Sequence, residues 1–174
     1  MIYRSEGKKA EGGLRMREIE FRGKRVDNLE WVYGSLVTYT DRYFPVIVTN
    51  AFHEDDGRVS VEYEAVASGT VCQYTGLKDK HGKRIYEGDI VKDDRGEVGR
   101  ILFIMQECGF AIIWKWYDSR LGHRSRGGGY DQDGSLEVIG NVYDNPKLIE
   151  ERFVNPGKRI DTDFRVRENP IVWR

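Results

Sequence analysis

The sequence contains few cysteines and has no long apolar run. Its 174 residues include two cysteines, Cys72 and Cys108, without C-x-x-C spacing. So few thiols argue against a disulfide framework and favour a reduced cytoplasmic setting, in which both are expected to be buried. No stretch approaches the roughly 18 apolar residues of a membrane span, and the start "MIYRSEGKKAEGG" lacks the apolar segment of a secretion signal. We therefore expect a soluble, cytoplasmic protein without a membrane partner.

The chain also lacks an excess of charge of either sign. Its 28 Lys and Arg nearly cancel 29 Asp and Glu, for a net charge of −1. This balance argues against a strongly basic domain that coats nucleic acid, although a local basic patch remains compatible with it. Hydrophobic residues make up 39% and charged residues 33%. Such a polar composition predicts that part of the chain lies outside the core as arms or long hairpins.

Helical periodicity is nearly absent until "KLIEERF" after Pro146, and short strand patterns separated by turns dominate instead. The pattern predicts a mainly β protein, with an SH3-like or pseudo β-barrel core, a short C-terminal capping helix and flexible terminal arms. The expected divisions are an extension over residues 1–15, a β-barrel domain over 16–152 and a polar arm over 153–174. "MREIEFRG" from Met16 reads like a second start, so the extension could arise from alternative initiation.

Two strand patterns locate the expected core and an expected edge. "GEVGRILFIM" and "GFAIIWKWY" are apolar at nearly every position over part of their length, which predicts central strands with Trp114 in the core. "RVSVEYEAV" alternates instead, and this predicts an edge strand whose Val59, Val61, Tyr63 and Ala65 pack on one covered face.

The stretch "TGLKDKHGKRIYEGDIV", residues 75–91, combines two turn patterns. Asp79 can accept hydrogen bonds from the turn backbone, and Gly82 can take the positive φ of a type I turn with a G1 bulge. Gly88 and Asp89 are then expected to bend the chain into a buried strand, with the Asp89 carboxylate accepting backbone N–H bonds. The stretch is therefore interpreted as a structural corner.

Three segments resemble the YopX-like proteins of bacteriophages and prophages. They are "MREIEFRGKRVDNLEWVYGSLV", "QYTGLKDKHGKRIYEGDIV" and "EVIGNVYDNPKLIE", which occur in that order between residues 16 and 150. The resemblance implies a β-rich pseudo-barrel with a capping helix, made in the cytoplasm of an infected or lysogenic bacterial cell. It implies no catalytic residues, and the function of the family is uncharacterised.

For each candidate catalytic or metal motif, a purely structural interpretation of the same residues is favoured. His53, Glu54, Asp55 and Asp56 are interpreted as a solvated turn, since adjacent residues point in different directions. Neither cysteine has a cationic neighbour that would activate it as a nucleophile. Glu87 and Asp89 could share a strand face as an acid and base, but a solvated Glu87 and a backbone-bonded Asp89 are favoured. We expect no cofactor and no enzymatic activity.

The strongest functional pattern is "WKWYDSRLGHRSRGGGYD". Its aromatic and basic side chains suit single-stranded nucleic acid, and the candidate contacts are Lys115, Trp116, Arg120, Arg124 and Arg126. A solvated hairpin loop is the competing interpretation.

The polar C-terminus suggests assembly. Phe164, Ile171 and Trp173 are isolated apolar residues in it, and an arm that inserts them into a neighbour would give a homo-oligomer; a disordered tail is the alternative. The sequence thus favours a non-enzymatic binding or assembly module. Nucleic-acid binding through Arg120–Arg126 and an enzyme whose site leaves no linear motif remain the alternatives, and a phage or host protein partner is unspecified.

Overall fold

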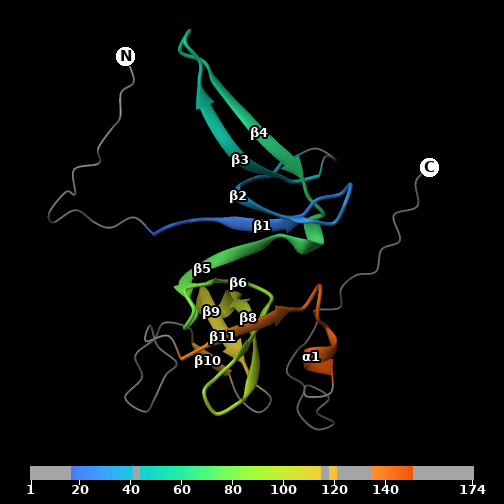
Figure 1. Ribbon diagram of the computed structural model, residues 1–174, viewed down its shortest axis with the longest axis vertical. Helices are drawn as coiled ribbons and strands as arrows, with labels where there is room; N and C mark the ends of the chain where they lie inside the picture. Colours follow the sequence, from blue (N-terminus) through green and yellow to red (C-terminus); the bar gives the residue numbers. More distant parts are fainter. Residues whose placement is uncertain (1–16, 41–43, 115–117, 121–134, 151–174) are drawn as a thin grey trace, which may run out of the picture.

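The computed structural model describes residues 17–40, 44–114, 118–120 and 135–150, which form two antiparallel sheets (Figure 1). The first sheet has the order β4-β3-β2-β1-β5-β6, and the second has the order β10-β9-β8-β7-β11. The strands are β1 Phe21–Lys24, β2 Trp31–Val37, β3 Val46–His53, β4 Val59–Ala65, β5 Cys72–Lys78, β6 Arg84–Tyr86, β7 Asp89–Lys92, β8 Val98–Ile104, β9 Gly109–Ile113, β10 Asp118–Arg120 and β11 Glu137–Asn141.

Helical structure among the described residues is short. Two 3-10 turns, Ser68–Thr70 and Met105–Glu107, lie between strands, and α1 spans Lys147–Glu150 after Pro146. The prediction of a mainly β fold with a short C-terminal helix is confirmed. In the part of the chain that the structure describes, no helix has the length and apolar character needed to cross a bilayer.

Strands of both sheets enclose the main core. Ile85 from β6 packs in one cluster with side chains of β7, β8 and β9, and Leu77 from β5 joins it. The buried members are Ile85, Val91, Ile101, Phe110, Ile112, Trp114 and Leu136. β5 and β6 belong to the first sheet, whereas β7, β8 and β9 belong to the second. Because strands of both sheets surround this one core, the lower half of the molecule in Figure 1 is barrel-like. The expectation that β8, β9 and Trp114 lie at the centre is confirmed.

The predicted corner is also observed. One oxygen of Asp79, Oδ1, accepts the backbone N–H groups of His81 and Lys83, each at 2.9 Å, and Gly82 has φ +80°. The other oxygen accepts the N–H of Val138 at 3.1 Å. Since Val138 is in β11, the turn after β5 is tied to a strand about sixty residues further along. Asp79 therefore helps to close the barrel-like half as well as its own turn.

Gly88 carries the second bend. It has φ +77°, a left-handed value that residues with a Cβ rarely adopt. Its N–H donates to the Ile101 carbonyl and its own carbonyl accepts from Val142, both at 2.9 Å. The bend therefore positions the start of β7 between β8 and β11.

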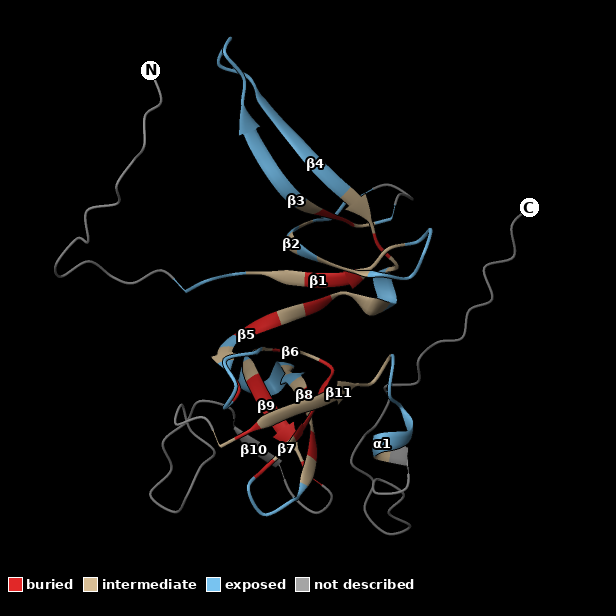
Figure 2. Ribbon diagram, viewed as in Figure 1, coloured by how far each residue is buried: buried red, intermediate tan, exposed pale blue. Residues whose placement is uncertain are grey.

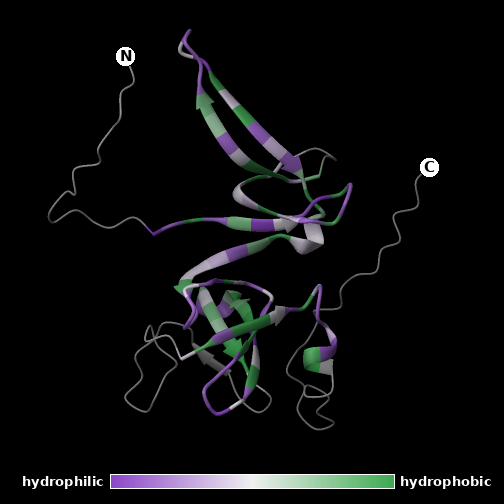
Figure 3. Cartoon of the chain, viewed as in Figure 1, coloured by the Kyte–Doolittle hydropathy of each residue, from purple (hydrophilic) through white to green (hydrophobic). Residues whose placement is uncertain are grey.

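The β3–β4 hairpin projects away from the rest of the described residues (Figure 1). Beyond the first residues of β3 its surface is exposed on both faces (Figure 2). The prediction that Val59, Val61 and Tyr63 pack on a covered face is wrong: they are 58%, 47% and 59% exposed. The strand alternates as expected, and the hydropathy colouring shows the alternation (Figure 3), but no described element covers the apolar side. Of the four residues predicted to share this face, only Ala65, at the base of the hairpin, is partly buried.

Candidate functional site

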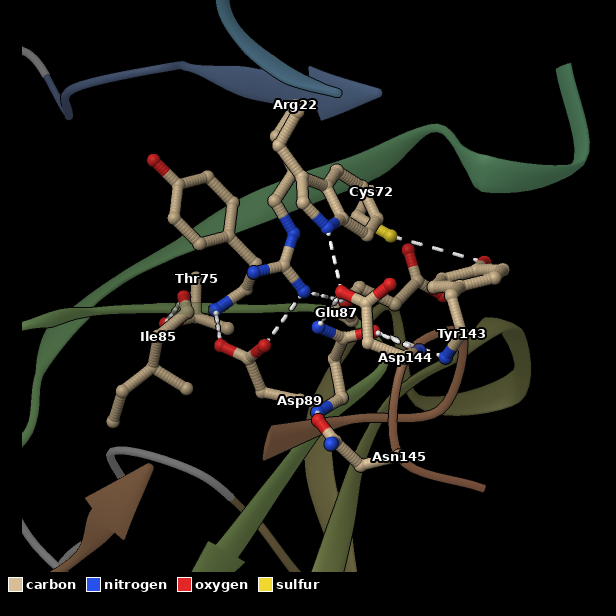
Figure 4. Close-up of polar contacts among 12 residues, drawn as sticks. Arg22, Cys72, Thr75, Ile85, Glu87, Asp89, Tyr143, Asp144 and Asn145 are labelled. Carbon is tan, nitrogen blue, oxygen red and sulfur yellow. Dashed lines mark hydrogen bonds and ion pairs between the residues drawn. The ribbon is translucent and has the colours of Figure 1, made fainter. Parts of the chain in front are cut away.

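The two sheets are joined at a buried polar cluster, here called the junction (Figure 4). Arg22, in the middle of β1, directs its guanidinium toward Asp89, the first residue of β7. The Arg22 Nη2 atom is 2.6 Å from Asp89 Oδ1, and the two side chains are 7% and 1% exposed. The other carboxylate oxygen accepts the Tyr86 N–H at 2.8 Å. This ion pair links the first sheet to the second.

Two aromatic rings lie against the Arg22 guanidinium. Its central carbon lies 4.6 Å from the ring centroid of Trp31 and 4.7 Å from that of Tyr86. Such stacking favours a planar cation in a site with little water. Burial opposes the charge, but attraction to Asp89 and Cys72 and their hydrogen bonds outweigh it, so the pKa of Arg22 is raised. Arg22 is therefore a permanent cation.

Asp89 is held in place by the same contacts. Burial raises the pKa of its carboxyl group, and this is opposed by the charge of Arg22 and by the Tyr86 N–H bond. The expectation that Asp89 accepts a backbone N–H bond is confirmed. Sequence reasoning does not identify Arg22 as its partner, because Arg22 lies 67 residues away. Because both carboxylate oxygens are engaged within the fold, the acid and base interpretation of Asp89 has no support in the geometry.

A second group of contacts extends the junction toward the surface. Trp31 Nε1 donates to Asp144 Oδ2 at 2.7 Å, and Asn141 Nδ2 donates to the same oxygen at 2.8 Å. Lys24 forms an ion pair with Asp144 Oδ1. Burial acts to raise the pKa of Asp144, but hydrogen bonds from Lys24, Asn141 and Trp31 outweigh it and lower the pKa to about 2. The loop after β11 is thereby fastened to β1 and β2.

Cys72 lies beside this network, with its thiol 3.8 Å from the Tyr143 hydroxyl. It is buried, as predicted, and burial raises its pKa in spite of the nearby Arg22. A buried thiol with a raised pKa is a poor nucleophile. Burial likewise raises the pKa of Tyr143. These side chains are suited to packing at the junction.

Two side chains differ from the expectations. Cys108 is exposed, although it was expected to be buried, because it occupies the left-handed turn (φ 50°) that precedes β9. Glu87 was expected to be solvated, but it is partly buried, and burial raises its pKa against a hydrogen bond from the Phe103 N–H at 3.4 Å. The Glu87 carboxylate thus accepts a backbone hydrogen bond from β8 at the junction.

The acidic turn at the tip of the hairpin is exposed. His53 ends β3, and Asp56 accepts the N–H of Arg58 at 3.1 Å and pairs with its Nε at 2.6 Å. Across residues 17–40, 44–114, 118–120 and 135–150, no three His, Cys, Asp or Glu side chains are grouped as metal ligands. The contacts at the tip are those of a turn.

The predicted nucleic-acid and arm residues fall mostly outside the described ranges. Lys115, Trp116, Arg124 and Arg126 lie there, as do Phe164, Ile171 and Trp173. Arg120 ends β10, whose backbone alone is described. Nucleic-acid contact and arm exchange therefore stay predictions. The terminal arms, residues 1–15 and 153–174, are likewise outside the described residues.

What the structure adds is an apolar face on the projecting hairpin. Val59, Val61 and Tyr63 alternate along β4 and so share one face of the hairpin. Opposite them on β3 lie His53, Ala51 and Val48. The first two are also exposed. The alternation in the sequence correctly places these β4 side chains on one face, but no described element forms the covering layer that was predicted for them.

Together these features define a β-rich protein in which two antiparallel sheets enclose the core and a hairpin extends from one edge. The model of the YopX protein family matches residues 20–150, and the chain belongs to this family. Among solved structures, it is similar to the crystal structure of protein EF1440 from Enterococcus faecalis, with 21% identity and a TM-score of 0.54. That similarity covers 78% of this chain and 100% of the other, and it shows the fold. No curated protein matches the chain.

Proposed function

We propose that the chain is a phage or prophage protein that acts as a non-enzymatic binding or assembly module in the cytoplasm of the bacterial host cell. The observation that carries this proposal is the projecting β3–β4 hairpin with its exposed face of Val59, Val61 and Tyr63 (Figure 2). A row of large apolar side chains on an exposed strand is costly in water and is typical of a surface that another molecule covers.

The junction supports the non-enzymatic half of the proposal. Two of its carboxylates are engaged within the fold: Asp89 binds Arg22, and Asp144 binds Lys24 and Trp31. Catalytic acids and bases need atoms that can reach a substrate, whereas these atoms fasten one sheet to the other. The phage or prophage setting rests on the resemblance of three sequence segments to YopX-like phage and prophage proteins, and the family match over residues 20–150 supports the YopX part of that resemblance.

The test is the light-scattering mass of the full chain and of a variant with Val59→Thr, Val61→Thr and Tyr63→Thr. Threonine keeps the β propensity while removing the apolar face. We expect the unaltered chain to exceed its monomer mass of 20.2 kDa and the variant to return to it. A matched control, Phe52→Thr, removes an exposed apolar side chain from the other face of the hairpin, on the inner strand β3, and should assemble normally.

The same measurement is made with a mixed-sequence single-stranded oligonucleotide at low and moderate salt. A complex that weakens with salt would favour the basic segment around Arg120 instead, because neutralised phosphates release counterions. A chain that stays at its monomer mass, takes up no oligonucleotide and binds no other molecule through the hairpin would contradict the proposal.

A further inference from the structure

The β3–β4 hairpin has an open strand edge as well as an apolar face. β4 is the outermost strand of its sheet. At its base the edge is covered, since Ala65 accepts a hydrogen bond from Val26 at 3.1 Å and Val66 forms a bridge with Arg25. From Val59 to Tyr63 no described strand pairs with this edge.

The backbone hydrogen bonds show which groups this edge presents. The Arg58 carbonyl accepts from Glu54 at 2.9 Å, and the Glu62 carbonyl is 3.3 Å from Thr49 Oγ1, so even-numbered residues direct their backbone toward β3. Ala65, an odd-numbered residue, directs its carbonyl outward to Val26. Because strand residues alternate, Val59, Val61 and Tyr63 present their backbone N–H and C=O groups at the open edge.

Proteins usually protect such an edge with proline, lysine or a β-bulge. β4 has no proline and no lysine over Val59–Ala65. The hairpin does contain a bulge, but it lies in β3 between Val48 and Asn50, on the inner side. The edge of β4 is therefore regular and able to accept another strand.

We infer that this edge pairs with the β4 edge of a second copy of the chain, antiparallel about a twofold axis at Val61. The inference rests on the proposed function and names its partner. Each Val61 faces the partner's Val61, and each Val59 faces the partner's Tyr63. These are pairs of outward-directed residues, so they exchange backbone hydrogen bonds, and their side chains lie on one face. The two first sheets become one continuous sheet.

Charge selects this register over its neighbours. With the axis at Val61, Arg58 lies opposite the partner's Glu64, and Ser60 lies opposite the partner's Glu62. Arg58 uses Nε for Asp56, and Glu64 uses Oε2 for Arg25, so the guanidinium and the carboxylate each have further atoms to offer. The twofold axis repeats this contact, so two Arg58–Glu64 ion pairs flank the apolar centre, one on each side.

The adjacent registers that keep the outward residues paired are unfavourable. An axis at Glu62 sets that carboxylate against its own copy. An axis at Ser60 sets Arg58 against the partner's Glu62, but this gain is offset because Glu64 then faces the partner's Asp56 and Tyr63 faces the partner's Gly57, which has no side chain. Like charges directly opposite each other destabilise a strand pair. A shift by one residue would instead place apolar side chains on the polar face.

The experiment is disulfide cross-linking of the full chain with Val61→Cys, in a Cys108→Ser background that removes the exposed native thiol. Residues opposite each other in a hydrogen-bonded pair have Cα atoms about 5.5 Å apart, within the range that a disulfide spans. The matched control is Val59→Cys in the same background. Across the proposed axis, two such residues lie four positions apart, roughly 14 Å, which is too far.

We expect a cross-linked dimer on a non-reducing gel for Val61→Cys, and a yield at least about tenfold lower for Val59→Cys. Equal yields, or no dimer from Val61→Cys, would overturn the inference. Charge exchange gives a second readout by light scattering. Arg58→Glu should weaken the dimer, and adding Glu64→Lys should restore it, because the pair is then reversed in sign. A double variant as weak as Arg58→Glu alone would contradict the register.

The two proposals fail differently. If the threonine variant loses mass but Val61→Cys does not cross-link, the hairpin is an assembly surface that uses another geometry. If the unaltered chain is a monomer that binds a different molecule through the hairpin, the module remains and the second copy is excluded. A monomer that binds nothing through this surface would contradict both.

Discussion

The guanidinium of Arg22 and the carboxylate of Asp89 meet at 2.6 Å across the boundary between the two sheets. Arg22 belongs to β1 and Asp89 opens β7, so one ion pair joins strands that never pair through their backbones. The rings of Trp31 and Tyr86 shield the guanidinium from water. The relative position of the sheets thus depends on a few buried charges, and this makes the junction sensitive to single substitutions.

Removing one charge should destabilise the fold strongly. Asp89→Asn leaves Arg22 buried without a counter-charge, and we expect the free energy of unfolding to fall by about 3–5 kcal/mol. Urea denaturation followed by tryptophan fluorescence measures this. Asp27→Asn is the control, because its pair with Arg25 lies at the surface, where water screens the charges, and should contribute little to stability.

The double variant Arg22→Met, Asp89→Asn sharpens the test of the ion pair. It leaves no unpaired charge, so it should be more stable than Asp89→Asn alone. If the two substitutions instead add their separate losses, the charges do not interact as the geometry indicates.

The Asp79 turn gives a second prediction. Asp79→Ala removes the acceptor of three backbone N–H groups, from His81, Lys83 and Val138. Asp79 is 5% exposed, so these groups lose their partner in a poorly hydrated place, and we expect a loss of about 2–4 kcal/mol in urea denaturation. Asp79→Asn keeps one carbonyl oxygen and should be milder. Equal losses for the two variants would show that the hydrogen bonds are not the cause.

The successes and failures of the sequence predictions have a common physical basis. Patterns local to the chain were interpreted correctly: the Asp79 and Gly82 turn, the apolar strands β8 and β9, and the helix after Pro146. Their determinants lie within a few residues of each other. The prediction failed where the answer depends on what covers a strand, since alternation in β4 indicates which side chains share a face but not whether another element packs on it.

The junction could not be predicted for a related reason. Arg22 and Asp89 are separated by 67 residues, and each is an ordinary surface residue type in its own segment. Only the pairing of β1 with β5 and the bend at Gly88 bring them together. A charge next to an apolar strand entry is a local sign of burial; Asp89 carries this sign, whereas Arg22 lies in the alternating segment "REIEFRG" and does not.

The two thiols should differ in reactivity. Cys72 is 1% exposed and its pKa is raised by burial, whereas Cys108 is exposed. With a chromogenic disulfide reagent at pH 8, we expect one fast and one slow phase, separated by at least about 100-fold because Cys72 reacts only when the structure opens. In Cys108→Ser the fast phase should vanish, and urea should accelerate the remaining one. Two thiols of equal rate would show that the junction is open to solvent.

Asp144 should make the free energy of unfolding fall in acid. Its pKa is lowered to about 2 in the folded state, below the value of about 3.9 for an unfolded chain. A depressed carboxyl pKa means that the contribution to stability is complete above about pH 4 and is lost as the pH falls toward 2.

The comparison is urea denaturation of the unaltered chain and of Asp144→Asn at several pH values. The side chain is 36% exposed, so solvent reduces the effect, and we expect the variant to be less stable at pH 7 by about 1 kcal/mol. This difference should shrink between pH 4 and 2, because protonation removes the same charge from the unaltered chain. Trp31→Phe removes one donor to Asp144, so the pKa of Asp144 in the folded state should move back toward its unfolded value. The pH range over which this stability is lost should then become narrower. A difference that stays constant down to pH 2 would show that Lys24, Asn141 and Trp31 do not stabilise the ionised carboxylate.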